Sequence, residues 1–205
     1  MTRQIDLYFD FSSPYSYLSV ARANHLLDGL PIRLNLRPIV LGSIFKRLGW
    51  ESSPFLAQAR KLDYMWLDVA RQARRHGLPF HKPSHFPVNS VLAARVATCA
   101  PDEPWLADFC VAAFQAYFVH DENLSEPNVI GRLLLELGLD SREILDRATS
   151  AHNKSDLRQV TEQADALGVF GAPTFVVNQH LFWGDDRFEA AVDACIQDSA
   201  ELPPK

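Results

Sequence analysis

The chain is short of cysteine. Its 205 residues include three, Cys99, Cys110 and Cys195, and no two of them form a Cys-x-x-Cys pair. Common zinc knuckles and dithiol redox centres need that spacing, so both are excluded. Each cysteine lies in an apolar helical pattern, which favours buried, unreactive thiols. Long apolar runs are missing too, and no stretch approaches the length of a membrane span.

An excess of positive charge is also lacking. Lys and Arg total 20 against 25 Asp and Glu, which gives a formal net charge of −5. This balance argues against general nucleic-acid binding, although a local pocket can still hold a small anion. The first residues run directly into a strand pattern containing Asp6 and Asp10, unlike a signal peptide. We therefore expect a protein of the cytoplasm, or of an organelle matrix, that binds neither nucleic acid nor membrane.

Two further kinds of site are disfavoured. His76, His81 and His85 are close in sequence, but prolines interrupt the helical spacing of metal ligands, and no cysteine or acidic ligand lies nearby. We expect no metal site. Ser13 is not part of a Gly-x-Ser-x-Gly elbow, which argues against a Ser–His–Asp hydrolase.

The order of predicted elements is strand, helix, strand, a helical block, two strands and a helix. Apolar and polar residues alternate over residues 5–11 and 32–36, with a helical pattern over residues 14–27 between them. Such a β-α-β unit predicts two parallel strands. Strands return at residues 174–177 and 180–182 as a hairpin, before a helix over about residues 186–199. Within the block, helices are predicted over residues 43–48, 53–77, 104–119, 127–138 and 153–167, with two more starting at Asn89 and Asp140.

This order predicts an α/β protein, a thioredoxin-like fold with a large all-helical insertion. Residues 1–40 and 166–205 would form the discontinuous thioredoxin-like domain, and residues 41–165 the helical insertion domain. Without the helical block, four strands of a thioredoxin core remain. A chain of 205 residues is long enough to bury a sizeable core.

The segment Ser-Pro-Tyr-Ser, residues 13–16, lies where the first strand meets the first helix. A serine followed by proline is typical of a helix start, where free N–H groups and the helix dipole stabilise an anion. In redox proteins of the thioredoxin type, Cys-x-x-Cys occupies this place. Here both sulfur positions are hydroxyls, Ser13 and Ser16. We infer that a ligand brings the thiol.

A second motif, Gly-Ala-Pro-Thr at residues 171–174, directly precedes a predicted core strand. Proline entering a strand has no N–H donor, and a cis bond between Ala172 and Pro173 suits a tight turn. We expect the N–H and C=O of Ala172 to be unpaired there and able to pair with an extended peptide ligand. A simple loop proline is the alternative for this motif taken alone.

A third motif, Trp-Gly-Asp-Asp-Arg at residues 183–187, opens the last helix. An N-cap is the simple interpretation. In the functional interpretation, free N–H groups bind a carboxylate while Asp185 or Asp186 pairs with an ammonium group. Gly184 allows a close approach of the backbone. The γ-glutamyl end of glutathione carries both groups on one carbon.

Candidate contacts also occur within the helical block. Arg60 and Lys61 are either a solvated basic turn or a source of one cation for a ligand carboxylate. Phe86 and Asn89, with Arg95, are expected to line a cleft between insertion and core, and we take Phe86 and Asn89 as candidate substrate contacts. Asn89 also fits a helix cap.

Four ordered segments resemble the 2-hydroxychromene-2-carboxylate isomerase family. They are residues 9–18, 60–65, 169–175 and 181–187, so the resemblance covers essentially the whole chain. This family is close to the kappa-class glutathione transferases, and both share the DsbA-like arrangement of a thioredoxin fold with a helical insertion. The resemblance implies a glutathione-dependent enzyme that acts on a small aromatic carboxylate. A homodimer is left open.

The resemblance also implies roles for individual residues. Ser13 matches the serine that holds the glutathione thiolate, and Lys61 matches a lysine used for glutathione. Ala172, before Pro173, matches the residue that pairs with the cysteinyl backbone. The segment that grips the γ-glutamyl end corresponds to Trp183, Gly184, Asp185 and Asp186.

Two residues depart from the family pattern. Trp50 stands where kappa-class sequences have an asparagine that contacts glutathione, and Phe86 replaces a tyrosine that lies near substrate in the isomerases. The implied reaction interconverts 2-hydroxychromene-2-carboxylate and trans-o-hydroxybenzylidenepyruvate. Ser13 would donate a hydrogen bond to sulfur, because a serine without an adjacent base is a poor nucleophile.

The alternatives are a kappa-class-like glutathione transferase and a non-catalytic thioredoxin-fold peptide-binding module. A disulfide oxidoreductase is disfavoured by the two serines.

Overall fold

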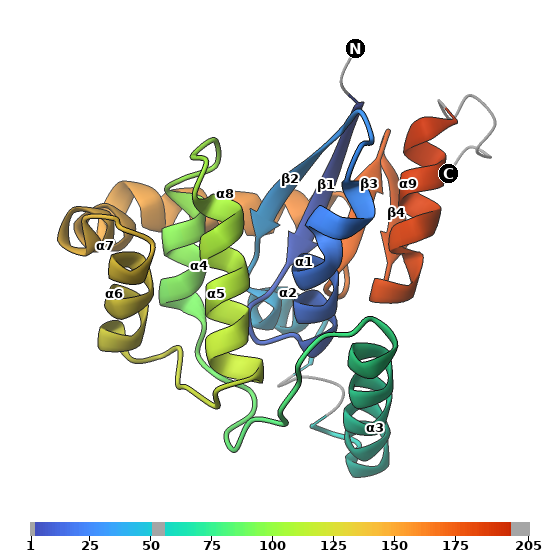
Figure 1. The fold of residues 1–205 in the computed structure, drawn as a ribbon, viewed down its shortest axis with the longest axis horizontal. Helices are drawn as coiled ribbons and strands as arrows, with labels where there is room; N and C mark the ends of the chain where they lie inside the picture. The colour runs from blue at the N-terminus through green and yellow to red at the C-terminus, as the bar shows by residue number, and fades with distance from the viewer. Residues whose placement is uncertain (1–2, 51–55, 198–205) are drawn as a thin grey trace.

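The computed structural model describes residues 3–50 and 56–197. A sheet of four strands in the order β2-β1-β3-β4 forms its centre (Figure 1). β1 (Arg3–Phe9) pairs in parallel with β2 (Ile32–Pro38) and antiparallel with β3 (Thr174–Val177). β4 (His180–Trp183) pairs antiparallel with β3. The predicted parallel pair and the predicted hairpin are both confirmed.

β1 is shorter than the alternation in the sequence predicts. It ends at Phe9, although the alternation continues to Phe11, whose side chain is fully buried. Asp10 explains the difference, because its carboxylate Oδ1 accepts the Ser12 N–H at 2.7 Å. A side-chain bond of this kind turns the backbone and competes with the strand ladder. The turn leads directly into α1 (Pro14–Leu27).

Seven helices separate β2 from β3 in the described chain. They are α2 (Leu41–Arg47), α3 (Ala59–Arg75), α4 (Val91–Thr98), α5 (Leu106–Phe118), α6 (Pro127–Glu136), α7 (Ser141–Thr149) and α8 (Ala151–Ala166). The predicted start of the long helix at residues 53–54 lies outside the described residues. After β4 come a short 3-10 turn, η1 (Asp185–Arg187), and α9 (Phe188–Ile196). The domain boundaries at residues 40/41 and 165/166 stay a prediction.

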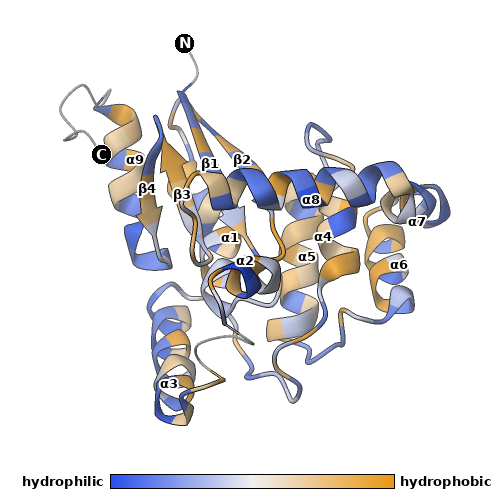
Figure 2. Ribbon diagram, turned by 180° about the vertical axis from the view of Figure 1, so that it is seen from behind, coloured by the Kyte–Doolittle hydropathy of each residue, from blue (hydrophilic) through white to orange (hydrophobic). Residues whose placement is uncertain are grey.

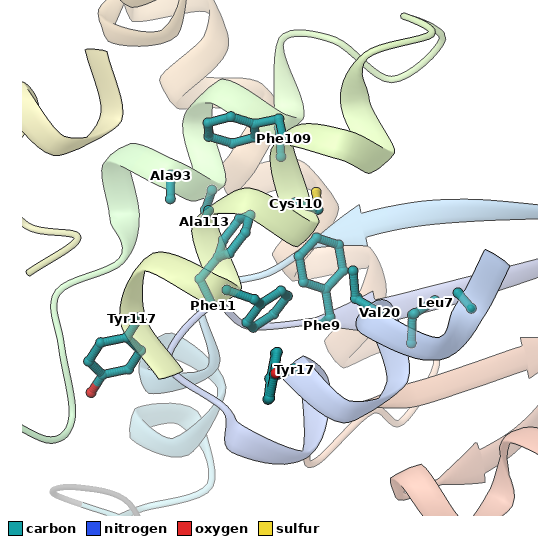
Figure 3. Close-up of a cluster of buried hydrophobic side chains, with 14 of the residues drawn as sticks. Leu7, Phe9, Phe11, Tyr17, Val20, Ala93, Phe109, Cys110, Ala113 and Tyr117 are labelled. Atoms are coloured by element: carbon teal, nitrogen blue, oxygen red, sulfur yellow. The ribbon is translucent and has the colours of Figure 1, made fainter. Parts of the chain in front are cut away.

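The sheet lies between two layers of helices. One face of β1, formed by Ile5, Leu7 and Phe9, is fully buried in a cluster that includes side chains from α1, α5 and α9. Figure 3 shows part of this cluster, with Leu7 and Phe9 near side chains of α1 and α5. On the other face, Tyr8 joins a smaller cluster with Ile44 of α2, together with residues of α8. Figures 1 and 2 show α8 crossing the sheet on the side opposite α1. This arrangement leaves the junction of β1 and α1 facing the inserted helices.

Candidate active site

A cleft of about 970 Å³ opens where β1 runs into α1. Its walls come from the starts of α1, α2 and α4, from one face of α3, and from the segments before β3 and after β4. Arg60, a candidate cation, does not line the cleft, but ten of the residues predicted from the sequence do: Ser13, Lys61, Phe86, Asn89, Ala172, Pro173, Trp183, Gly184, Asp185 and Asp186. Arg95, which was also expected in the cleft, is not among the lining residues.

Ser13 is the N-cap of α1, as predicted. Its Oγ accepts a hydrogen bond from the Ser16 N–H at 3.2 Å, and Pro14 follows at the first helical position. The Ser13 hydroxyl also donates to the carbonyl oxygen of Ala172, 2.8 Å away. The helix start and the segment before β3 are therefore bonded directly to each other.

The peptide bond between Ala172 and Pro173 is cis, the isomer predicted from the sequence. The expectation that the Ala172 carbonyl is unpaired is wrong, because that oxygen accepts the Ser13 hydroxyl. The Pro173 carbonyl accepts the Gly184 N–H at 3.0 Å, which joins this segment to the start of η1. A carbonyl oxygen has two acceptor positions, so Ala172 can still accept a hydrogen bond from a ligand amide.

Asp10 is a buried acid at the floor of the cleft, 7% exposed. Its Oδ1 accepts from the Ser12 N–H at 2.7 Å and the Ser90 hydroxyl at 3.2 Å, and its Oδ2 accepts from the Leu41 N–H at 2.8 Å. One carboxylate thus joins the segments that open α1, α2 and α4. Burial raises the pKa of Asp10, and these hydrogen bonds oppose that rise. Sequence reasoning missed this role, although an acid between Phe9 and Phe11 was a signal.

Asp185 is also buried, at 4% exposure, and its carboxylate is already engaged. Oδ1 accepts from the Ser19 hydroxyl at 2.8 Å and from Arg22 Nε at 3.1 Å. Burial raises the pKa of Asp185, and the charge of Arg22 opposes that rise. The sequence left open whether Asp185 or Asp186 pairs with a ligand ammonium, and these bonds argue against Asp185. Asp186 has a side chain that is 70% exposed and keeps that candidate role.

Gly184 is required by the local geometry. Its φ of 110° favours glycine, and a Cβ there would lie 2.6 Å from Asp186 Oδ1. Gly184 takes the N-cap position of η1, where no side-chain cap is found among the described residues. The simple N-cap interpretation of the two aspartates is therefore wrong.

Trp183 lies at the rim of the cleft and is 53% exposed. Its ring packs edge-to-face on Phe170, with centroids 4.7 Å apart. A Cβ at Gly171 would lie 2.4 Å from Trp183 Nε1, so glycine permits the indole to pack there. Phe170 was not predicted, because one exposed aromatic residue has no distinctive sequence pattern.

One face of α3 forms another wall. Lys61, Met65, Asp68 and Gln72 line the cleft at helical spacing. The Tyr15 hydroxyl donates to Asp68 Oδ2 at 2.9 Å and so ties α3 to α1. Burial, with the neighbouring Asp68 carboxylate, raises the pKa of Tyr15. Lys61 therefore lies on the side of α3 that faces the cleft, where its ammonium group can pair with a ligand carboxylate.

The part of the cleft between α2 and the segment before α4 is largely apolar. Phe45 and Trp50 stack with centroids 5.8 Å apart, and Phe86 packs edge-to-face on Trp66 at 4.8 Å. Asn89 lies beside them, and its Oδ1 accepts the Val91 N–H at 3.2 Å. The N-cap of α4 is Ser90, so the expectation that Asn89 caps this helix is wrong. Aromatic walls of this kind suit a flat aromatic ring.

The structure also bears on metal binding, cysteine burial and membrane insertion. Within residues 3–50 and 56–197, no group of three His, Cys, Asp or Glu side chains is placed to hold a metal ion. Cys110 and Cys195 are buried, whereas Cys99 is partly exposed, which corrects the expectation of full burial. None of the helices described is long and apolar enough to cross a membrane.

Residues 4–195 match the family model of the DSBA-like thioredoxin domain. The chain belongs to this family. It is 27% identical to a 2-hydroxychromene-2-carboxylate isomerase of Sphingobium xenophagum, over 92% of this chain and 96% of the relative. It is 26% identical to glutathione S-transferase kappa 1 of Homo sapiens, over 92% of this chain and 89% of the relative.

A solved structure of 2-hydroxychromene-2-carboxylate isomerase has the same fold. It superposes with a TM-score of 0.85 at 24% sequence identity, covering 98% of this chain and 100% of the other. These matches confirm the resemblance to the isomerases and the kappa-class transferases. They also confirm the thioredoxin-like fold with a helical insertion.

Proposed function

We propose that this DSBA-like protein is a glutathione-dependent isomerase acting on a small aromatic carboxylate. The substrate would be 2-hydroxychromene-2-carboxylate, or a related aromatic catabolite, and the product trans-o-hydroxybenzylidenepyruvate or its counterpart. The observation that carries the proposal is one cleft in which Ser13, Ala172 and Asp186 lie beside an aromatic-walled space. Its volume of about 970 Å³ is at the upper end of the range of about 300–1,000 Å³ for small-molecule sites, which leaves room for a small aromatic ring beside a tripeptide.

The residues present fit glutathione along its length. The carbonyl of Ala172 keeps an acceptor position for the cysteinyl N–H. Gly184 and Asp186 meet the γ-glutamyl end, where main-chain N–H groups take the carboxylate and Asp186 takes the ammonium. Lys61 offers a cation to the other carboxylate. When bound, glutathione supplies a sulfur nucleophile that adds reversibly to a conjugated carbon and permits rotation about a former double bond.

Ser13 activates this sulfur by donating a hydrogen bond to it and does not itself act as a nucleophile. Its two partners are the Ser16 N–H and the Ala172 carbonyl, and neither is a base that could take the serine proton. Its hydroxyl can instead turn to donate to a thiolate at the N-terminus of α1. That helix end lowers a thiol pKa because its free N–H groups and dipole favour negative charge.

The aromatic substrate is placed between Trp50 and Phe86, beside Asn89. Stacking on these rings would hold the substrate ring in one plane while the side chain of the substrate rotates. Orientation of two bound reactants supplies much of the rate gain in such a reaction. The low cysteine content is consistent with a reducing compartment such as the cytoplasm.

Product analysis tests the proposal against its main alternative. The purified protein is mixed with glutathione and 2-hydroxychromene-2-carboxylate while the ultraviolet spectrum and the free thiol concentration are followed. An isomerase converts the substrate with no net loss of thiol. A kappa-class-like transferase, the second candidate because of the relative at 26% identity, consumes one thiol for each electrophile. Saturable binding of an extended peptide without turnover would instead support the peptide-binding module.

A further inference from the structure

A buried ion pair lies directly behind the glycine-containing turn of the cleft. Arg22 is 7% exposed and Asp185 is 4% exposed. Arg22 Nε donates to Asp185 Oδ1 at 3.1 Å, and Arg22 Nη2 donates to the main-chain carbonyl of Asp185 at 2.7 Å. One guanidinium thus holds both the side chain and the main chain of the same residue.

Residues of α1 and α9, and one residue just after α3, contribute to this network. From α1, the Ser19 hydroxyl donates to Asp185 Oδ1 at 2.8 Å. From α9, the Glu189 carboxylate accepts from Arg22 Nη1 at 2.6 Å and Nη2 at 3.2 Å. Just after α3, His76 Nε2 lies 3.9 Å from Asp185 Oδ2. The start of η1 is therefore anchored to α1 and, through Arg22, to α9.

Stability alone does not explain such a network, since a buried ion pair often gives little net stability. The shape of the adjoining turn suggests another reason. Gly184 has φ of 110°, and the Asp186 carboxylate folds back over it. The first N–H groups of a helical turn have no partner within it, so their direction depends on what holds the turn. Arg22 holds this turn at the residue between Gly184 and Asp186.

The same helix carries Ser13 and Arg22. Nine residues separate them, which is about 13 Å along a helix axis at 1.5 Å per residue. The rigid helix α1 thus fixes the distance between two parts of the site. One is the Ser13 hydroxyl, which is proposed to bind the sulfur, and the other is Arg22, which anchors the turn proposed to bind the γ-glutamyl end.

We propose that Arg22 is a positioning residue for the γ-glutamyl end of glutathione. Acting through Asp185, it fixes the main chain of residues 184–186 at a set distance from Ser13. Arg22 is not among the described residues that line the cleft, so it does not meet the ligand itself. The inference rests on the proposed use of glutathione.

Calorimetry with three ligands and two variants of Arg22 tests this positioning role. Glutathione and γ-glutamylcysteine both carry the γ-glutamyl end, whereas cysteinylglycine lacks it. Arg22→Met should weaken both γ-glutamyl ligands at least about ten-fold and leave cysteinylglycine within about two-fold. Arg22→Lys should give a smaller loss, because one ammonium cannot replace a fork of donors.

Arg132→Met is the control for loss of an arginine paired with two acids, because the more exposed Arg132 pairs with Glu122 in the loop before α6 and with Glu136 on α6. It should leave all three affinities unchanged. A uniform loss across the three ligands, or no loss in folded Arg22 variants, would overturn the positioning role. If Arg22→Met does not fold, the same comparison with Arg22→Lys decides. Failure of the unchanged protein to bind glutathione or γ-glutamylcysteine overturns the proposed function as well.

Discussion

The Ser13 hydroxyl donates a hydrogen bond to the carbonyl oxygen of Ala172, with 2.8 Å between the two oxygens. The same hydroxyl accepts the Ser16 N–H. A hydroxyl has one proton to donate, so Ser13 can donate to sulfur only after turning away from Ala172. A ligand amide that pairs with the Ala172 carbonyl would favour that turn. Activation of the thiol should therefore depend on both the serine and the peptide part of the ligand.

Ser13→Ala should raise the pKa of the bound glutathione thiol. A free thiol has a pKa of about 8.5, and the helix N-terminus with Ser13 should lower it well below that value. A hydrogen bond to a charged group contributes about 1.5–3 kcal/mol, so its loss should raise the thiol pKa by about one to two units. Thiolate absorbance in the near ultraviolet, followed against pH, measures this change.

The neighbouring Ser12 supplies the control. Its Oγ is buried and has no hydrogen-bond partner among the described residues, so Ser12→Ala removes a hydroxyl of the same size without removing a bond. We expect the thiolate signal and turnover of Ser12→Ala to match those of the unchanged protein. If Ser13→Ala also leaves both unchanged, Ser13 has no part in activating the thiol.

The two adjacent aspartates should respond differently to the same substitution. Asp186→Asn removes an exposed charge, and glutathione affinity should fall about ten-fold or more, because a charge-assisted hydrogen bond contributes about 1.5–3 kcal/mol. Asp185→Asn should bind glutathione nearly as well, because its oxygen can still accept from Ser19 and Arg22. Calorimetry measures both affinities. An equal loss in the two variants would contradict the assignment of the ammonium to Asp186.

Much of the fold could be predicted from local patterns. The β-α-β unit, the hairpin and the Ser13 cap follow from alternation, turn residues and capping chemistry, which act between neighbours in the chain. The motifs at residues 171–174 and 183–187 were also recognisable, because proline restricts the backbone and glycine permits conformations that other residues avoid. Local rules are sufficient wherever the interacting groups are close in sequence.

What could not be predicted depends on contacts between distant residues. The bond from Ser13 reaches a residue 159 positions away, and the bond from Arg22 to the Asp185 side chain spans 163 positions. Sequence reasoning therefore treated the Ala172 carbonyl and the Asp185 carboxylate as free. Asp10 was missed for the same reason, since its partners at Leu41 and Ser90 lie in other helices.

Gly171→Ala should weaken glutathione binding by displacing an aromatic ring. The added Cβ would lie 2.4 Å from Trp183 Nε1, so the indole must leave its place at the cleft rim. We expect about a ten-fold loss of affinity, the equivalent of about 1.4 kcal/mol.

Gly131→Ala on α6 is the control, because its Cβ would make ordinary contact with Leu145 at 3.6 Å. That variant should be about 0.5–1 kcal/mol more stable and bind glutathione normally. Unchanged affinity in Gly171→Ala would remove Trp183 from the site.

Asp10 should make the protein less stable as pH rises, whereas most carboxylates make a protein more stable as pH rises. Burial raises the pKa of Asp10 above its ordinary value of 3.8, so the folded state holds this proton more tightly than the unfolded state. Between those two pKa values the folded state binds more protons, and the free energy of unfolding falls as pH rises. The contribution is about 1.4 kcal/mol for each unit of pKa difference.

Asp10→Asn isolates this contribution, because asparagine keeps the shape and cannot titrate. Its amide nitrogen faces one of the three donors, from Ser12, Leu41 or Ser90, so the variant should lose about 1–3 kcal/mol at low pH. As pH rises through the raised pKa, the advantage of the unchanged protein over Asp10→Asn should shrink. Urea unfolding of both proteins between pH 4.5 and 8 measures the difference. A constant difference across that range would show that the folded protein does not raise the pKa of Asp10.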